Sequence, residues 1–115
     1  MRSYVADQRR YANFLAYSAA SDAIGLAEVS VRSDYVNGTE TSPVAFLEGL
    51  YVVPLARRKG IGAALVAAAC DWGRSAGCRE IASDALLDNS TSYVVHRALG
   101  FEETERVVYF RRKLA

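Results

Sequence analysis

Apolar positions in this chain fall into short runs separated by turn residues, and the longest run is Val44–Val53. Both alternating faces of that run are apolar, which predicts a strand buried at the centre of a sheet, and Pro54 ends it. Earlier in the chain, Asn13–Ser18 and Ile24–Arg32 predict two strands. The turn residues Ala20–Ala23 lie between them, so we expect a β-hairpin.

The apolar period changes from two to nearly four after the central strand. One stripe predicts a helix over Gly60–Ala76, with Gly77 as its C-terminal cap. The stripe consists of Ile61, Leu65, Ala68 and Trp72. Glu80–Ala85 then predicts a strand parallel to Val44–Val53, because a helical crossover connects them. Ser33–Pro43 carries turn signals and is expected to be a surface loop.

The last third of the chain predicts a second helix and further strands. The helix spans about Asn89–Leu99, with Gly100 as its cap. We expect it to bury Val94, Val95, Ala98 and Leu99. Strands follow from Phe101 and over Val107–Arg112, whereas Met1–Ala12 predicts a tail or a residual helical turn. Together these elements predict an α/β fold, a mixed sheet with helices packed on it.

Length and composition restrict the class of protein. A chain of 115 residues with about half of them apolar is expected to form one domain over 1–115. The formal net charge of +1 gives no bulk electrostatic case for nucleic acid or a membrane surface. There is no apolar run of membrane-spanning length and no signal-peptide pattern, which predicts a cytoplasmic protein. Cys70 and Cys78 lack metal-site spacing and are expected to be reduced packing residues, with no metal bound.

Basic residues are concentrated locally, at Arg9–Arg10, Arg57–Lys59 and Arg111–Lys113. The middle cluster opens the first helix with the spacing Arg57-x-x-Gly60-x-Gly62, which leaves backbone N–H groups unshielded at the positive end of a helix. Such a cradle suits a pyrophosphate. The third position of a dinucleotide fingerprint falls on Leu65, and the P-loop Gly-Lys-Ser/Thr is absent. The alternative is that the glycines merely open a helix behind a solvated loop.

The arrangement of strand, proline, Arg57–Gly62, apolar helix and Asn89–Phe101 resembles the GCN5-related N-acetyltransferases, or GNAT family. The pyrophosphate loop of that family has the form Gln/Arg-x-x-Gly-x-Gly/Ala. More narrowly, four segments are similar to aminoglycoside 6'-N-acetyltransferases. They are Asp34–Gly38, Glu40–Gly49, Ala82–Asp84 and Gly100–Arg106. The resemblance covers the chain from about Asn13 onward and implies the acyl-CoA N-acyltransferase fold.

The resemblance implies acetyl-CoA as the acyl donor. Its pantetheine arm would meet backbone groups of Leu50, Tyr51 and Val52, and Asn89 would contact it at the start of the second helix. The pyrophosphate would be held by the basic loop and the helix start, which comprise Arg57, Arg58, Lys59, Gly60, Ile61, Gly62 and Ala63.

Substrate contacts are implied at Tyr35, Glu48, Asp84 and Glu105. A polycationic, hydroxyl-rich aminoglycoside is suited by separated carboxylates and an aromatic ring, and Glu48 is costly to bury ionised unless a cation meets it. Each position has an alternative. Glu48 would instead pair with a nearby arginine, Asp84 would cap a turn, Tyr35 would pack in its loop, and Glu105 would be solvated.

The implied reaction is direct attack of an amine on the thioester. Glu48 or Asp84 would accept the ammonium proton through water, and a backbone N–H near a bulge at Gly49 would meet the oxyanion. Many acetyltransferases of this class place a tyrosine where this chain has His96, which would protonate the thiolate or serve a structural role. Tyr93, one turn earlier, is a weaker substitute.

The N-terminal region departs from the family pattern, which has a strand and two helices before the hairpin. With only Met1–Ala12 there, we expect the first strand and most N-terminal helices to be absent. An exposed sheet edge would then invite a homodimer. The first functional hypothesis is an enzyme acting on an aminoglycoside or another amine, with no nucleic acid or membrane partner. The second is a shortened domain that binds acetyl-CoA and turns over poorly.

Overall fold

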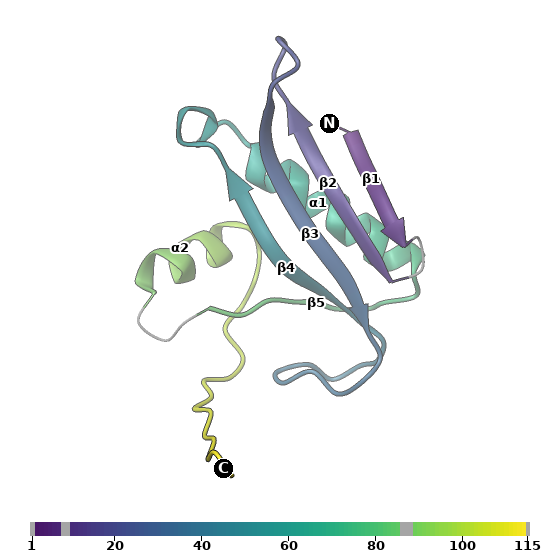
Figure 1. Cartoon of the computed structure of the whole chain (residues 1–115), viewed down its shortest axis with the longest axis vertical. Coiled ribbons are helices and arrows are strands. Elements are labelled where there is room, and N and C mark those ends of the chain that lie inside the picture. The colour runs from purple at the N-terminus through teal and green to yellow at the C-terminus, as the bar shows by residue number, and fades with distance from the viewer. Residues whose placement is uncertain (1, 8–9, 86–88, 115) are drawn as a thin grey trace.

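A sheet in the order β1-β2-β3-β4-β5 forms the centre of the computed structural model, which describes residues 2–7, 10–85 and 89–114 (Figure 1). The strands are β1 (Arg2–Asp7), β2 (Tyr11–Tyr17), β3 (Ala23–Arg32), β4 (Val44–Val52) and β5 (Ile81–Ala82). Each neighbouring pair from β1 to β4 is antiparallel, and β4 pairs with β5 in parallel. The mixed sheet and the predicted hairpin of β2 and β3 are therefore confirmed.

The N-terminal residues are the first departure from the prediction. Instead of a tail or helical turn over Met1–Ala12, the chain forms β1, and Ala12 already lies in β2. Tyr4 pairs with Asn13, so the outer edge of the sheet is β1 rather than the hairpin. An edge strand is wetted on one side and needs few apolar residues, which is why its polar sequence gave no signal. Met1 and Arg9, part of one predicted basic cluster, lie outside the described residues.

Helix α1 (Ile61–Ser75) covers one face of the sheet (Figure 1). Leu65 is 0% exposed, and Val66 and Ala69 are buried beside it. The predicted stripe residues Ile61, Ala68 and Trp72 pack against the same core. The helix approaches β4 so closely that a Cβ on Gly73 would lie 2.9 Å from the Cβ of Ala45. Gly77, at φ 88°, follows the helix, as its predicted capping role requires.

The free thiols Cys70 and Cys78 pack against this core, as predicted. Burial raises the pKa of the Cys78 thiol. A buried thiol of this kind behaves as a small apolar side chain.

The parallel pairing of β4 with β5 is short. The register pairs Ala45 with Ile81 and Phe46 with Ala82. The predicted strand Glu80–Ala85 is thus confirmed in direction but reduced in length. Beyond Phe46, β4 continues to Val52 while no other described strand pairs with that edge. The two strands therefore separate into an opening that begins at Ser83.

Helix α2 (Ser90–Ala98) lies beside the open edge of β4 (Figure 1). The prediction that it buries Val94, Val95 and Ala98 is wrong, since no residue of this described helix is buried and Val94 is 69% exposed. Leu99, the fourth predicted residue, follows the helix as its C-cap and is half-buried against the core. The apolar positions were identified correctly, but no described strand lies beyond β5 to cover them.

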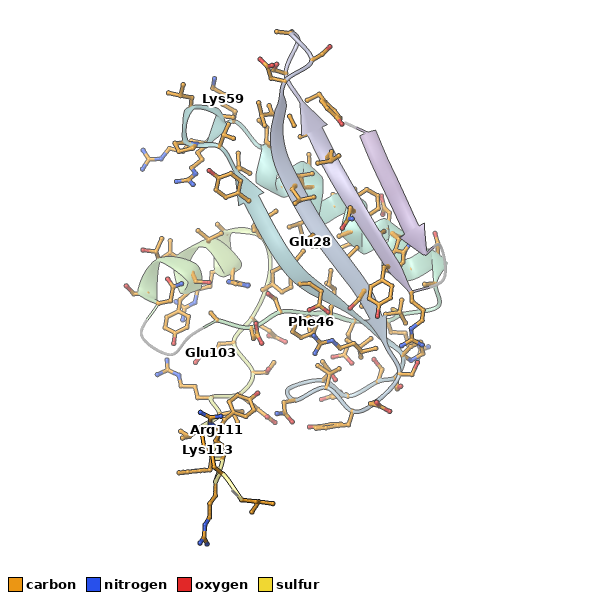
Figure 2. The ribbon with its side chains drawn as sticks, in the orientation of Figure 1. Glu28, Phe46, Lys59, Glu103, Arg111 and Lys113 are labelled. Atoms are coloured by element: carbon orange, nitrogen blue, oxygen red, sulfur yellow. The ribbon has the colours of Figure 1, made fainter. Side chains whose placement is uncertain are left out.

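The C-terminal segment is the second departure. Residues 101–114, all described, form no helix or strand, so the predicted strands from Phe101 and over Val107–Arg112 are wrong. Phe110 is 92% exposed, and the segment extends away from the sheet, with Arg111 and Lys113 at its far end (Figures 1 and 2). The apolar run Val107–Phe110 suits a strand, but a strand requires a partner edge for its backbone groups. Neither described helix is long and apolar enough to cross a membrane.

Candidate functional site

A β-bulge in β4 lies at the start of the opening between β4 and β5. Glu28 pairs with Gly49 and the next residue, Val29, pairs with Leu47, so Glu48 is the extra residue. A Cβ on Gly49 would lie 3.1 Å from the Glu28 carboxylate, which explains the glycine. The bulge predicted here is confirmed. Because a bulge bends and twists its strand, it turns β4 away from β5.

Glu48 is already paired with a cation. The Arg32 Nη2 group lies 2.9 Å from both carboxylate oxygens of Glu48, and Arg32 Nε lies 3.3 Å from Oε2. The Ser30 hydroxyl donates to the same Oε2 at 2.5 Å. The guanidinium also lies 3.6 Å from the ring centroid of Phe46, which Figure 2 labels on β4. The structure therefore shows the alternative role of Glu48, an ion pair with a nearby arginine.

A basic loop follows β4 at the opposite end of the opening. A short 3₁₀ turn, η1 (Pro54–Ala56), leads into it, and Arg57 Nε donates to the Val52 carbonyl at 2.8 Å. The Arg57 guanidinium lies 5.8 Å from the Tyr51 ring centroid, and Arg58 has a φ of 63°. Lys59 projects beside this loop near the start of α1 (Figure 2). Three cations therefore surround one helix N-terminus.

The start of α1 exposes its backbone donors. Gly60 caps the helix at φ 80°, and the first helical bond runs from Ala64 N to Gly60 O at 3.0 Å. Helix geometry therefore leaves the amides of Ile61, Gly62 and Ala63 without an intrahelical acceptor. The nearest atom to a Cβ on Gly62 would be a Val52 methyl at 4.0 Å. This donor set, with its cationic rim, fits a pyrophosphate.

The predicted pantetheine contacts lie between the bulge and the basic loop. Leu50, Tyr51 and Val52 pair with β3 through one edge of β4. Their other edge meets no described strand. The Val53 N–H donates to the Ile24 carbonyl of β3, so strand alternation directs the backbone groups of Tyr51 toward β3 as well. The backbone groups of Leu50 and Val52 face the free edge, where the Val52 carbonyl already accepts from Arg57.

A cavity of about 770 Å³ lies between the end of β5, helix α2 and the C-terminal segment. It brings together three predicted site residues, Asp84, His96 and Glu105. Gly38 in the Ser33–Pro43 loop closes another side, since a Cβ there would overlap the Thr104 hydroxyl. Tyr35 does not line this cavity and is 74% exposed, and Glu48 does not line it either.

Asn89 has a structural partner of its own. Its side-chain oxygen accepts from the Ser92 N–H at 3.0 Å and caps α2. Capping of this kind satisfies an amide that the helix cannot, so Asn89 fixes where α2 begins.

Sequence reasoning missed Glu80, which holds the Ser33–Pro43 loop. Its Oε1 accepts from the N–H groups of Glu40 at 2.9 Å and Thr41 at 2.8 Å, and from the Thr41 hydroxyl. The Thr41 hydroxyl and then the Glu40 amide lower the pKa of the Glu80 carboxyl. Nothing local signals this contact, because the partners are distant in sequence.

His96 has partners at both ring nitrogens. Nδ1 lies 2.8 Å from the Ser92 carbonyl and 3.1 Å from the Ser92 hydroxyl, and Nε2 lies 2.8 Å from the Ser83 hydroxyl. Phe101 packs edge-on against the imidazole at 5.3 Å between centroids. Tyr93, on the same helix, carries the Arg106 guanidinium 5.7 Å from its ring centroid. No group of three or more His, Cys, Asp or Glu in the described residues is arranged to hold a metal.

The splayed strands, the amide cradle at the helix start and the cavity beyond β5 define an acyl-CoA-dependent transferase site. Residues 2–101 match the model of the acetyltransferase (GNAT) family. The chain belongs to this family, as its motifs predicted.

The curated relatives with similar sequences carry the same name. An aminoglycoside N(6')-acetyltransferase type 1 from Stenotrophomonas maltophilia is 57% identical over 88% of this chain and 66% of its own length. One from Acinetobacter baumannii is 50% identical over 99% of this chain and 77% of its own length. The chain thus spans about two thirds to three quarters of these relatives.

Solved structures also support membership of the acetyltransferase family. The enzyme AAC(6')-Iy in complex with the bisubstrate analogue CoA-S-monomethyl-acetylneamine superposes with a TM-score of 0.86 at 50% identity, covering 90% of this chain and 70% of that one. The apo 6'-N-acetyltransferase AAC(6')-IG of Acinetobacter haemolyticus gives a TM-score of 0.89 at 51% identity, covering 93% and 73%.

Proposed function

We propose that this protein transfers an acetyl group from acetyl-CoA to an amine of an aminoglycoside by direct attack. The observation that carries the proposal is the opening between β4 and β5, which has an anion cradle at one end and an acidic cavity at the other. The similarity to enzymes with this activity, one of them bound to a CoA–aminoglycoside bisubstrate analogue, supports it.

The cofactor half of the site uses mainly backbone groups. The amides of Ile61, Gly62 and Ala63 hold the pyrophosphate, with the positive end of α1 behind them. Arg57, Arg58 and Lys59 neutralise its remaining charge, and the free edge of β4 at Leu50–Val52 meets the pantetheine arm. Asn89 contributes by fixing the start of α2 beside that arm.

The acceptor half uses carboxylates. Asp84 and Glu105 face the cavity and attract a polycationic sugar. Tyr35 stacks on a sugar ring from the Ser33–Pro43 loop, which Gly38 joins to the C-terminal segment. Glu48 completes the acidic set from the bulge, where an acceptor ammonium would share it with Arg32.

The chemistry requires a neutral nitrogen and a place for the oxyanion. Asp84, or Glu48 in the bulge, accepts the ammonium proton through water. A backbone N–H of the separated stretch of β4 donates to the thioester oxygen as charge develops on it. The acceptor nitrogen bonds to the acetyl carbon, the C–S bond breaks, and one proton passes from nitrogen to sulfur.

We also propose that the active form is a homodimer and that it acts in the cytoplasm. Val108, Tyr109 and Phe110 are exposed on a strand-like segment without a partner strand among the described residues. The outer edge of β5 offers such a partner in a second copy. Mass in solution tests this directly, and a monomer at assay concentration would contradict it.

Thiol release from acetyl-CoA in the presence of kanamycin tests the activity. We expect release that depends on both substrates, and mass spectrometry should find one added acetyl group on the antibiotic. A clear thermal shift with coenzyme A but no thiol release with any aminoglycoside would support a domain that binds acetyl-CoA without turnover. Release only with another class of amine would change the substrate and keep the reaction.

A further inference from the structure

A chain of hydrogen bonds connects helix α2 to the end of β5 through the imidazole of His96. The Ser92 carbonyl, 2.8 Å from Nδ1, can only accept, so Nδ1 must carry a proton. The Ser92 hydroxyl, at 3.1 Å, is a second acceptor for that proton. In a neutral imidazole Nε2 is then bare, and it accepts from the Ser83 hydroxyl at 2.8 Å.

This tautomer changes the role expected of His96. A neutral imidazole with no hydrogen at Nε2 cannot itself protonate a thiolate. The hydroxyl of Ser83 lines the cavity while it donates to the ring, and its oxygen keeps a lone pair for a further donor. Ser83 is the group placed to touch the reactants, and His96 acts through it.

Ser83 also occupies the right place on the sheet. It is the first residue after the last β4–β5 pair, Phe46 with Ala82, so it lies where the two strands begin to separate. Ser83 and His96 both line the cavity that contains Asp84. Phe101, edge-on to the imidazole at 5.3 Å, limits rotation of the ring.

We propose that Ser83 and His96 form a proton relay that carries the proton of the attacking nitrogen to the leaving sulfur. As the C–N bond forms, the nitrogen gives its proton to Ser83 Oγ, and the Ser83 proton moves to His96 Nε2. As the C–S bond breaks, the imidazolium returns a proton through Ser83 to the thiolate. The relay is thus restored, with no other reactant consumed.

The relay rests on the proposed acetyltransferase function. In it Ser83 is the catalytic residue, because it touches the reacting atoms, and His96 is a positioning and proton-storing residue behind it.

Other charged and titratable groups face the same cavity and would contribute to a pH profile. Glu80 and Asp84 lie on either side of β5 in the sequence, Cys70 comes from α1, and Tyr93 and Arg97 come from α2. The segment after α2 contributes Glu102, Glu103, Glu105 and Arg106, and also Tyr109. The test therefore isolates the histidine by observing it directly.

The sequence contains one histidine, so its ring signals in an NMR spectrum need no assignment. Long-range ¹H–¹⁵N correlation on the full chain above the imidazole pKa should show the neutral tautomer protonated at Nδ1. Ser83→Ala should shift the Nε2 resonance and leave Nδ1 nearly unchanged, whereas Ser75→Ala, on an exposed residue at the end of α1, should shift neither. A neutral ring protonated at Nε2 overturns the relay whether or not the protein turns over.

Single-turnover rates with both substrates saturating test the chemistry. Ser83→Ala and His96→Gln should each lower the rate by about 100-fold, the lower end expected for general acid–base catalysis. The double variant should be no slower than either single one, because the two residues act as a unit. Ser83→Thr keeps the hydroxyl and should recover most of the rate, and acceptor KM should change less than the rate throughout.

The pH profile separates the relay from a structural role. His96→Gln keeps a hydrogen-bonding group near Ser83 but cannot titrate, so the limb of the wild-type profile that matches the NMR titration of His96 should disappear. A Ser83→Ala rate within about threefold of the Ser75→Ala rate overturns the relay alone. Absence of thiol release by the wild-type protein overturns the proposed function instead.

Discussion

The two ends of the site are built by different forces. At the cofactor end, β4 and α1 are fixed by a packed core around Leu65 and Ala69, and the binding groups are backbone amides. At the acceptor end, α2 has no buried residue, and individual polar contacts such as His96 with Ser83 hold the elements together. A packed core gives a preformed binding surface. A surface held by separate polar contacts changes shape more easily when a ligand competes for one of those contacts.

The difference matters for how the protein binds its two substrates. A rigid amide cradle can recognise a pyrophosphate common to every turnover, and it loses little entropy when the anion arrives. A cavity lined by exposed carboxylates and a segment outside the sheet can adjust to different polycationic sugars. Stability and cofactor binding should therefore depend on the α1 side, and acceptor selection on the α2 side.

The largest expected effect concerns stability. Leu65→Ala removes a fully buried side chain between α1 and the sheet and should lower the free energy of unfolding by about 2–5 kcal/mol. Val94→Ala, on exposed α2, should change it by less than about 0.5 kcal/mol. Urea denaturation of the two variants measures both values. Similar losses would mean that α2 is packed in solution as firmly as α1.

The same contrast explains what the sequence could predict. The central strand and α1 carry local signals, namely a two-faced apolar run, a helical stripe and glycines at both helix ends. Both elements were therefore predicted correctly. The strand β1 and the C-terminal segment depend on which edge is available to pair. Hydrophobic pattern specifies the face that a strand presents, but not whether a partner edge exists.

Site residues divide in a similar way. The cradle was predicted because Gly60 and Gly62 sit at fixed offsets within one turn. The sequence predicted an ion pair of Glu48 only as the alternative to a substrate contact, and it did not identify Arg32 as the partner. Glu80 and Ser83 gave no signal, because their roles arise from contacts with Thr41 and His96 that only the folded chain creates.

The next effect is on cofactor binding. Gly62→Val has room in the free protein, because its nearest neighbour would be 4.0 Å away. The added side chain should block access to the amides of α1 and weaken coenzyme A binding by about 10–100-fold, equivalent to one lost charge-assisted hydrogen bond or more. Titration calorimetry measures it. Ala67→Val, exposed on the same helix, is the matched control and should bind normally, so equal affinities would refute the cradle.

A smaller effect separates the two carboxylates. Asp84 has no ion pair with any residue that the structure describes, whereas Arg32 already neutralises Glu48. Asp84→Asn should therefore raise the acceptor KM by about tenfold, the effect of one charge-assisted hydrogen bond. Glu48→Gln should raise it by only about threefold, in the range of an exposed ion pair. Neither change should alter coenzyme A affinity. The reverse order would make Glu48 the main cation site, with Arg32 displaced by substrate.

The smallest effect concerns the loop that carries Tyr35. Hydrogen bonds from Thr41 and Glu40 lower the pKa of the Glu80 carboxyl below its ordinary value of 4.5. The anchoring is therefore complete above about pH 4.5 and is lost as the pH falls through the lower, folded-state pKa. At neutral pH, Glu80→Gln should speed hydrogen exchange at the Glu40 and Thr41 amides, because a neutral amide oxygen is a weaker acceptor than a carboxylate.

Glu28→Gln, an exposed change on β3, is the control for that measurement and should leave both amides protected (Figure 2). Exchange in the wild-type protein should approach that of Glu80→Gln as the pH is lowered below the folded pKa of Glu80, when both proteins carry a neutral side chain there. Equal exchange at neutral pH would show that the loop is held from its other side, through Gly38 and Thr104. The acceptor end would then depend on the C-terminal segment even for the position of Tyr35.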